Sequence, residues 1–182
     1  LLSSRGIYAG LSYTAGLSDV TAEDMGPLLE AEKKHFKGQE LMGKTLGVVG
    51  LGAIGSSVAN MALGMGMKVI GYDPAISIDA AWRLPNQVQK AENLQQLLSR
   101  SDYISLHVPA IEATKNLINS TSLASIKDGA KLLNFARESI VNTADALVAL
   151  NTGKLSAYVT DFPSPELINR SDVIALPHLG AS

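Results

Sequence analysis

Cysteine is absent from this sequence of 182 residues. Without thiols the chain has no disulfide framework, no thiolate nucleophile and no sulfur-ligated metal, which suits a reducing, cytoplasmic environment. Its three histidines, His35, His107 and His178, lie too far apart in the chain to give a local metal-ligand spacing. The sequence therefore predicts no metal site and no disulfide-rich secreted domain.

An excess of one charge is also missing. The chain has 15 Lys and Arg against 17 Asp and Glu, a formal net charge of -2, and both signs are spread along it. No basic stretch can neutralise a nucleic-acid backbone, so we expect no nucleic-acid partner. The first residues, LLSSRGIYAGLSY, lack the basic region of a signal peptide and an initiator Met, which indicates a chain cut from a longer one. The length predicts one domain.

An uncharged stretch from Gly47 to Met67 has the length of a membrane span. Its glycines make it a weak candidate for a lipid-facing helix. Its parts predict a different structure: LGVVG is typical of a buried parallel strand, SSVANMAL of a helix, and KVIGYDP of a second buried strand ending at an acid and a proline. We therefore expect strand, glycine turn, helix and strand, and no membrane partner.

The turn in this unit carries a phosphate-binding spacing. Gly50, Gly52 and Gly55 follow the G-x-G-x-x-G pattern between the predicted strand and helix. The first glycine permits a tight turn, the second lets the backbone approach a pyrophosphate, and the third lets helix pack on strand. The helix that begins near Ala53 directs its free N–H groups at the phosphates. The alternative is that these glycines serve packing alone. Asp73, the next residue of the dinucleotide-binding pattern, favours the phosphate-binding interpretation.

Asp73 lies at the end of the second strand, about 20 residues after the glycines, where a carboxylate accepts hydrogen bonds from the adenosine ribose. The same carboxylate repels a 2'-phosphate, and Pro74-Ala75-Ile76 supplies no cation to receive one. The predicted cofactor is therefore NAD rather than NADP.

The rest of the chain continues the alternation of strands and helices. Helical patterns occur in AENLQQLLSR, SLASIKDGA and ALVALNTGK, the last capped by Asn142 and stopped by Gly153; strands are expected in SDYISLHVP, AKLLNFA, SAYVTDF and SDVIALP. This order predicts an α/β fold with a doubly wound parallel sheet of the Rossmann type, strand order 3-2-1-4-5-6 with a further strand. Ligands bind such sheets at the carboxyl ends of the strands.

Three smaller expectations concern single segments. Thr21 to His35 is predicted to be a helix with a possible capping box at Thr21 and a break near Pro27. Trp82 is expected to pack in a loop. The methionines Met61, Met65 and Met67 are expected to fill the core where helix meets sheet.

Three chemically useful residues follow the later strands: Arg137, Glu166 and His178. His178 is suited to exchange a hydroxyl proton while hydride moves to a nicotinamide. Glu166, if bonded to the other ring nitrogen, would raise the imidazole pKa and orient it. Arg137 is suited to clamp a carboxylate. Taken singly, each is as compatible with a solvated or structural role.

Several segments together resemble the D-isomer-specific 2-hydroxyacid dehydrogenases, and most closely their D-3-phosphoglycerate dehydrogenase branch. They are FKGQELMGKTLGVVGLGAIGSSVA, SDYISLHVPAIEATKNLIN, LLNFAR, YVTDFPSPEL and PHLGAS, and the likeness covers nearly the whole chain. The resemblance implies that residues 1–182 are a dinucleotide-binding domain, with 1–40 an N-terminal helical arm, and that the substrate domain is absent from this chain.

The resemblance also implies site residues. Arg137, Glu166 and His178 match the family's catalytic arginine, glutamate and histidine. The implied cofactor contacts are Gly50, Gly52, Ala53, Ile54, Gly55, Asp73, Val108, Pro109, Phe135, Ala136, Arg137, Asp161, His178 and Gly180. The chain departs from the family at Glu138, where a glycine is usual and where a carboxylate can compete for Arg137. It departs also at Asn142, which replaces an acid, and at Glu166, which follows Pro165 rather than preceding a proline.

The expected activity is an NAD-dependent interconversion of a small D-2-hydroxyacid and its 2-oxoacid, with 3-phosphoglycerate, the entry to serine biosynthesis, as leading substrate. Two alternatives stay open: an NAD(H)-sensing interaction protein of the corepressor type, and a dehydrogenase for glycerate-like or lactate-like acids. The fragment alone is expected to bind NADH and turn over little. A homodimer through the SYTAGLSDV arm is expected from the same resemblance.

Overall fold

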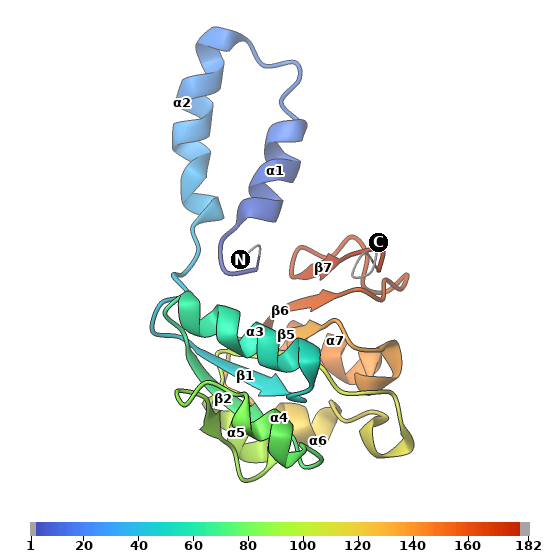
Figure 1. The fold of residues 1–182 in the computed structure, drawn as a ribbon. Helices are drawn as coiled ribbons and strands as arrows, with labels where there is room; N and C mark the ends of the chain where they lie inside the picture. Colours follow the sequence, from blue (N-terminus) through green and yellow to red (C-terminus); the bar gives the residue numbers. More distant parts are fainter. Residues whose placement is uncertain (1–2, 179–182) are drawn as a thin grey trace. The chain divides into compact units, whose positions relative to one another are not determined.

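The computed structural model describes residues 3–178 of the chain (Figure 1). It divides into two compact units, one up to Leu41 and one from Met42 onward. The larger unit contains the sheet and every predicted site residue that the structure describes.

The larger unit is built on one seven-stranded sheet, and all its strand pairs are parallel. The strand order is β3-β2-β1-β4-β5-β6-β7, so the predicted order and the further strand are confirmed. The strands are β1 (Thr45–Val49), β2 (Lys68–Tyr72), β3 (Gln89–Lys90), β4 (Tyr103–Leu106), β5 (Ala130–Asn134), β6 (Leu155–Thr160) and β7 (Val173–Ala175).

Helices connect the strands and cover the sheet. They are α3 (Ala53–Gly64), α4 (Ile78–Trp82), α5 (Leu94–Arg100), α6 (Ser120–Ala124) and α7 (Thr143–Asn151), with the short 3-10 turns η2 (Glu112–Thr114) and η3 (Glu138–Ile140). Right-handed crossovers place the helices that follow β1 and β2 on one face and those that follow β3, β4 and β5 on the other. Along that second face α5 contacts α6 and α6 contacts α7.

Asparagine caps begin three of these helices. The side chains of Asn93, Asn119 and Asn142 accept hydrogen bonds from backbone N–H groups in the first turns of α5, α6 and α7. The predicted cap at Asn142 is thus confirmed. Gly153, with φ +74°, follows the end of α7 as predicted.

The core is apolar on both sides of the sheet, as parallel sheets require. Val48, Leu106 and Leu132 are at most 1% exposed, and Leu97 and Leu98 of α5 belong to the same buried cluster as Leu106 and Leu132. The uncharged stretch 47–67 therefore consists of most of β1, the glycine turn and α3, and β2 begins directly after it. Within residues 3–178, no helix combines the length and apolar character that crossing a bilayer requires.

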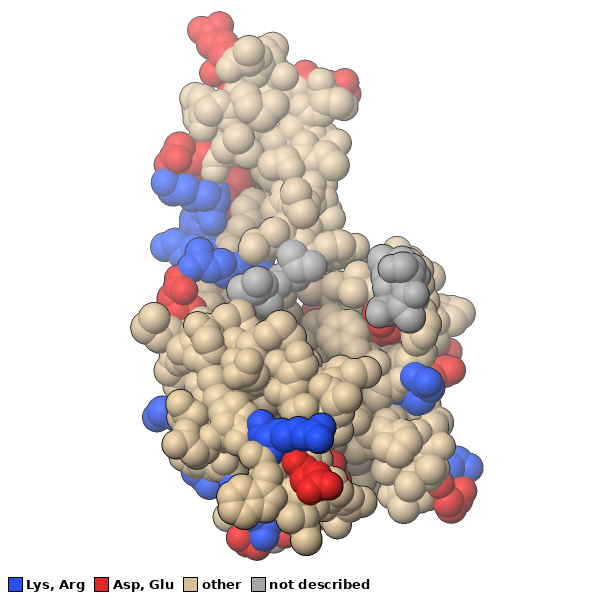
Figure 2. Space-filling view, in the orientation of Figure 1, with Lys and Arg blue, Asp and Glu red and all other residues tan. Residues whose placement is uncertain are grey.

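The strands end together. In register, Val49 pairs with both Tyr72 and Leu106, and farther along the sheet Leu106 pairs with Asn134, Asn134 with Thr160 and Thr160 with Ala175. The carboxyl ends of six strands therefore line one edge of the sheet. Figure 2 shows acidic and basic side chains interspersed over the face it draws, in keeping with the net charge of -2.

The smaller unit is a helical pair, α1 (Ile7–Ala15) and α2 (Ala22–Glu32), followed by η1 (Lys33–Phe36). None of these three elements has a buried residue. The rings of Tyr13 and Phe36 lie 5.3 Å apart, and Gly6 N–H donates to Phe36 O, so the segment after α2 packs back on α1.

The helix after Thr21 and its cap at Thr21 are confirmed, whereas three details of the smaller expectations are wrong. α2 runs through Pro27 without a break. Trp82 is 84% exposed rather than packed. Met61 and Met65 are 56% and 42% exposed, whereas Met67 is buried as expected.

Candidate dinucleotide and hydroxyacid site

The three positions of the β1–α3 turn are occupied by glycine for different structural reasons. Gly50 adopts φ +90°, and a Cβ there would lie 2.5 Å from His107 O. A Cβ on Gly55 would lie 1.9 Å from Gly50 O, so only glycine lets α3 start so close to β1. A Cβ on Gly52 would meet nothing within 4 Å. Protein packing thus accounts for the first and third glycines, and the second leaves open space in front of the backbone.

The N-terminus of α3 faces that open space. Gly52 is its N-cap and provides no side-chain cap, and the first turn has no acidic residue. Ala53 and Ile54 are exposed, Ile54 to 70%. Uncapped N–H groups with the positive end of the helix dipole behind them favour an anion such as a pyrophosphate.

Asp73 ties the end of β2 to this turn. One carboxylate oxygen, Oδ2, accepts the Leu51 N–H at 2.8 Å, and Oδ1 accepts the Ala75 N–H at 3.0 Å. The carboxylate is therefore fixed beside the glycine turn, with lone pairs left for a ribose hydroxyl. This is the place that the sequence predicted for it.

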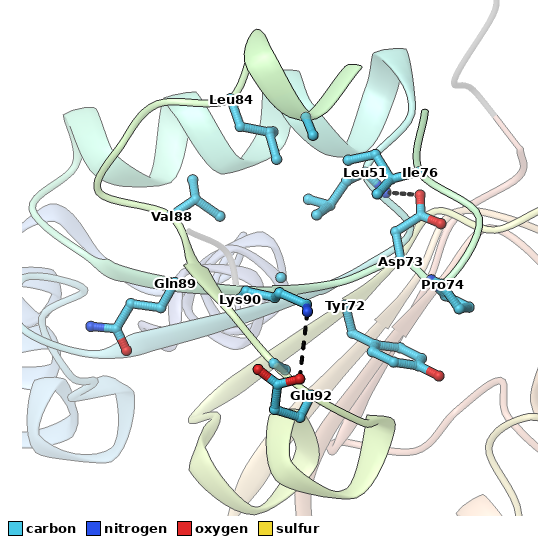
Figure 3. Close-up of a pocket in the computed structure, with 13 residues that line it drawn as sticks. Leu51, Tyr72, Asp73, Pro74, Ile76, Leu84, Val88, Gln89, Lys90 and Glu92 are labelled. Atoms are coloured by element: carbon cyan, nitrogen blue, oxygen red, sulfur yellow. Dashed lines mark hydrogen bonds and ion pairs between the residues drawn. The ribbon is translucent and has the colours of Figure 1, made fainter. Parts of the chain in front are cut away.

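A cavity of about 460 Å³ lies beside Asp73 (Figure 3). Figure 3 shows Leu51, Leu84 and Val88 turned toward one another across it, with the Lys90–Glu92 ion pair at 3.4 Å on its rim. Its walls suit an apolar group. Sequence reasoning missed Leu84 and Val88 because the segment 76–88 has no clear periodicity.

The end of β4 closes the other side of the glycine turn. His107 N–H donates to Val49 O at 2.7 Å, and Val108 Cγ1 lies 3.0 Å from a Cβ built on Gly50. His107 Nε2 is 2.8 Å from Ser105 Oγ, and burial lowers the pKa of His107. A neutral imidazole at neutral pH is the result, so this side of the turn brings no cation. Two residues after His107, the carbonyl oxygen of Pro109 accepts a hydrogen bond from Thr114 Oγ1 at 2.5 Å.

Beyond β5 the chain turns sharply and presents Arg137. Phe135 is 38% exposed, Ala136 is buried, and the Arg137 side chain is exposed with Nη1 donating to Ala136 O at 2.6 Å. No salt bridge joins Arg137 to Glu138 in the described part of the chain. The guanidinium therefore retains donors for an incoming carboxylate.

The segments after β6 and β7 complete the edge. Asp161 is 5% exposed, and its N–H donates to Asn134 O at 3.3 Å, which links the ends of β6 and β5. The His178 ring lies 5.3 Å from the ring of Phe162, and His178 adopts φ 53°, which is uncommon for a residue with a side chain. The predicted contact Gly180 lies outside the described residues.

Glu166 is not joined to His178. Its Oε2 accepts from Ser164 Oγ at 2.8 Å, and this bond lowers the pKa of the exposed Glu166 carboxyl. The structure therefore keeps Glu166 ionised and on the proline-containing loop, where it has a local partner. Among the described residues no group of three His, Cys, Asp or Glu is placed to hold a metal ion.

The sequence was also compared with known proteins. Residues 14–180 match the family described as "D-isomer specific 2-hydroxyacid dehydrogenase, NAD binding domain". The chain belongs to this family.

Curated relatives and solved structures agree with the family. The chain is 41% identical over 160 residues to a hydroxypyruvate reductase of Thermotoga maritima, covering 83% of this chain and 50% of that one. It is 40% identical over 157 residues to a D-3-phosphoglycerate dehydrogenase of Synechocystis, covering 83% and 28%. The apo structure of Rhodotorula graminis D-mandelate dehydrogenase superposes with a TM-score of 0.81 at 29% identity, covering 98% and 52%. The chain thus spans half or less of the curated relatives named.

The predicted family and the predicted cofactor, NAD, are both confirmed by this membership. The residues present fit the dinucleotide. The open space before Gly52, the uncapped start of α3 and the fixed Asp73 carboxylate would hold its pyrophosphate and adenosine ribose. In this NAD-binding domain, the turns after β5, β6 and β7 form the remainder of the edge.

Proposed function

We propose that this chain is the cofactor domain of an NAD-dependent oxidoreductase that interconverts a D-2-hydroxyacid and its 2-oxoacid, and that its substrate domain is not among these residues. The observation that carries the proposal is the shared sheet edge. The strands that end at the glycine turn are in register with those that lead to Arg137 and His178.

The bound NAD supplies the hydride acceptor for C2 of the hydroxyacid. Arg137 binds the substrate carboxylate with two parallel N–H donors and polarises the adjacent carbonyl. His178 takes the hydroxyl proton as the alcohol is oxidised and returns it in the reverse direction. Glu166 exchanges its bond to Ser164 for one to the imidazole when the substrate domain closes over the edge, and so stabilises the charged ring.

We propose 3-phosphoglycerate and 3-phosphohydroxypyruvate, hence a role in serine biosynthesis, as the leading substrate pair. The 40% identity to a protein named D-3-phosphoglycerate dehydrogenase supports this choice. The relative named hydroxypyruvate reductase supports an unphosphorylated acid as the alternative. An NAD(H)-sensing interaction protein of the corepressor type is the alternative from another class, because the same residues serve a sensor.

The test follows NADH oxidation by the full-length protein with 3-phosphohydroxypyruvate, hydroxypyruvate and pyruvate. We expect the phosphorylated oxoacid to be preferred and Arg137→Ala to lower kcat/KM by about 10²-fold, because the carboxylate loses its charged donors. Arg100→Ala is the matched control, since that guanidinium is exposed and donates to Gln89. If NADH binds and no oxoacid is reduced, the dehydrogenase proposal is wrong and the result favours the NAD(H)-sensing interaction protein.

We also propose a cytoplasmic homodimer formed through the smaller unit. α1 has no charged and no buried residue, and its Ile7, Tyr8 and Leu11 are 42%, 50% and 62% exposed. An uncharged helix with this much apolar surface is typical of an interface. Leu11→Glu is expected to give a monomer in sedimentation, with Ser18→Glu in the same unit as control. A dimer that persists in the Leu11 variant would contradict the interface.

A further inference from the structure

Two polar side chains are fully buried at the sheet edge that carries the site. Asn134 is the last residue of β5 and Thr160 the last of β6; they are register partners, and each is 0% exposed. Buried polar groups cost free energy unless they are hydrogen-bonded. Their partners therefore show what the pair, called here the strand-end pair, is for.

Asn134 uses its side-chain amide on the turn that presents Arg137. Its Nδ2 donates to Arg137 O at 2.9 Å, and its Oδ1 accepts the Ala136 N–H at 3.2 Å. Both ends of one amide thus grip the two residues before η3. An amide is the side chain of this size that supplies a donor and an acceptor at once.

Thr160 accepts hydrogen bonds from the segments that follow β6 and β7. Its Oγ1 accepts the Phe162 N–H at 3.1 Å, and its carbonyl accepts the Leu176 N–H at 2.8 Å. Phe162 in turn lies against the His178 ring, 5.3 Å between centroids. The hydroxyl of Thr160 therefore fixes the residue that contacts the imidazole.

Tyr158 and the backbone of Asp161 also connect the two residues of the pair. Burial raises the pKa of Tyr158 on β6, and contacts of its hydroxyl with Thr160 and Asn134 offset part of the rise. The Asp161 N–H donates to Asn134 O at 3.3 Å, so the two turns are tied to each other as well as to the sheet. Side chains and backbone thus form one connected polar network under the Arg137 and His178 segments.

We propose that the strand-end pair positions the two reactive side chains: Asn134 holds Arg137 at the height of the substrate carboxylate, and Thr160 holds Phe162 and through it His178. This inference rests on the proposed function, because it assigns the purpose of the pair by the roles of Arg137 and His178. Both residues of the pair are fully buried, so their role is to position other residues.

The test is made in the full-length protein with the oxoacid that it reduces best. Asn134→Ala removes both grips and is expected to raise KM, lower kcat and reduce kcat/KM by about 10²-fold, as for a catalytic group displaced by about 1 Å. Thr160→Val keeps the shape and removes the acceptor. It is expected to lower kcat with KM nearly unchanged, because the Arg137 clamp stays in place.

Asn134→Asp gives a readout that a merely structural role would not move. The introduced carboxyl is buried beside the Arg137 carbonyl. When ionised it can only accept hydrogen bonds, and when protonated it regains an O–H group that can donate to that carbonyl. The charged or titratable groups around it are Arg137, Glu138, Tyr158 and Asp161. Activity relative to Asn134→Ala is expected to rise at least tenfold as the pH is lowered, and a ratio that stays flat would overturn the proposal.

Ser101→Ala is the stability control, because it removes a buried side-chain hydrogen bond, to Leu97 O at 2.7 Å, at the opposite end of the sheet. If it lowers Tm as much as Asn134→Ala and lowers kcat/KM equally, the pair is structural and the inference is overturned. Arg137→Ala is run in parallel. An active Arg137→Ala enzyme contradicts the proposed function, whereas an inactive one beside a fully active Asn134→Ala enzyme contradicts only this inference.

Discussion

Gly52 and Gly55 stand three residues apart, and the structure predicts opposite effects for their substitution by alanine. Gly52 has φ -65° and ψ -164°, a conformation open to alanine, and a Cβ there would meet nothing within 4 Å. Gly52→Ala should therefore fold normally and place a methyl group where the pyrophosphate approaches. A protein that needed this glycine only for packing would not show such a space.

The magnitudes separate the two variants. Gly52→Ala weakens only the helix N-cap, at less than about 1 kcal/mol, while NADH should bind at least tenfold more weakly, about 1.4 kcal/mol. In Gly55→Ala the Cβ starts 1.9 Å from Gly50 O, so α3 must retreat by about 1.5 Å to reach the 3.4 Å of ordinary contact. Overpacking of this kind costs about 1–3 kcal/mol.

Thermal unfolding and NADH titration calorimetry on the same preparations distinguish them. Gly64→Ala, near the other end of α3 and with nothing within 4 Å of its Cβ, is the control that should change neither NADH affinity nor fold. The reasoning is refuted if Gly52→Ala binds NADH as tightly as the unaltered chain, or if it is destabilised as much as Gly55→Ala.

Three further predictions concern other positions. Asp73→Ala should weaken NADH binding and reduce the ratio of NADH affinity to NADPH affinity about tenfold or more in paired titrations, because the repulsion between the carboxylate and the 2'-phosphate is lost. An unchanged affinity ratio would contradict the role of Asp73 at the ribose. Asn142→Ala should cost about 1 kcal/mol in denaturant unfolding, since it removes the cap bond to Asp145 N–H. Burial raises the pKa of Asp102, but the Thr45 N–H and Lys127 outweigh it and lower the pKa below 3.8. The stabilisation by the Asp102 carboxylate is thus present above about pH 3.8 and lost as the pH falls through the lowered pKa. In denaturant unfolding, Asp102→Asn should therefore be less stable than the unaltered chain at pH 7, and the two free energies of unfolding should converge in acid.

The central βαβ unit was predictable because each part has a local cause. Branched apolar runs make buried strands, and the glycines at 50 and 55 are required by contacts within the same short segment. Asp73 was predictable for a similar reason, since the length of one helix fixes how far along the chain the second strand ends.

The misses arise where tertiary contacts decide. β3 is only Gln89–Lys90 and exists through its pairing with Ile70 and Gly71, which no local pattern reveals. Met61 and Met65 were expected in the core, yet the face of α3 that packs on the sheet is formed by small residues, Gly55, Ala59 and Ala62. A helix seated on small side chains leaves its larger ones outside.

The site shows the same division. The order of strands placed Arg137 and His178 at one edge, and the structure bears out that edge. It does not bring Glu166 to His178, because Ser164 is nearer along the chain and satisfies the carboxylate. Asn134 was missed because it stands within the apolar run LLNFA, where only its two hydrogen bonds to the following turn reveal its use.

Hydride transfer is the central claim, and isotope tracing measures it most directly. The full-length protein would be incubated with NAD and the C2-deuterated D- and L-forms of the hydroxyacid whose oxoacid it reduces best, and the NADH analysed by mass spectrometry. The account predicts that deuterium passes to the nicotinamide from the D-form alone. Deuterium arriving from the L-form, or from neither form while NADH binds normally, would contradict it.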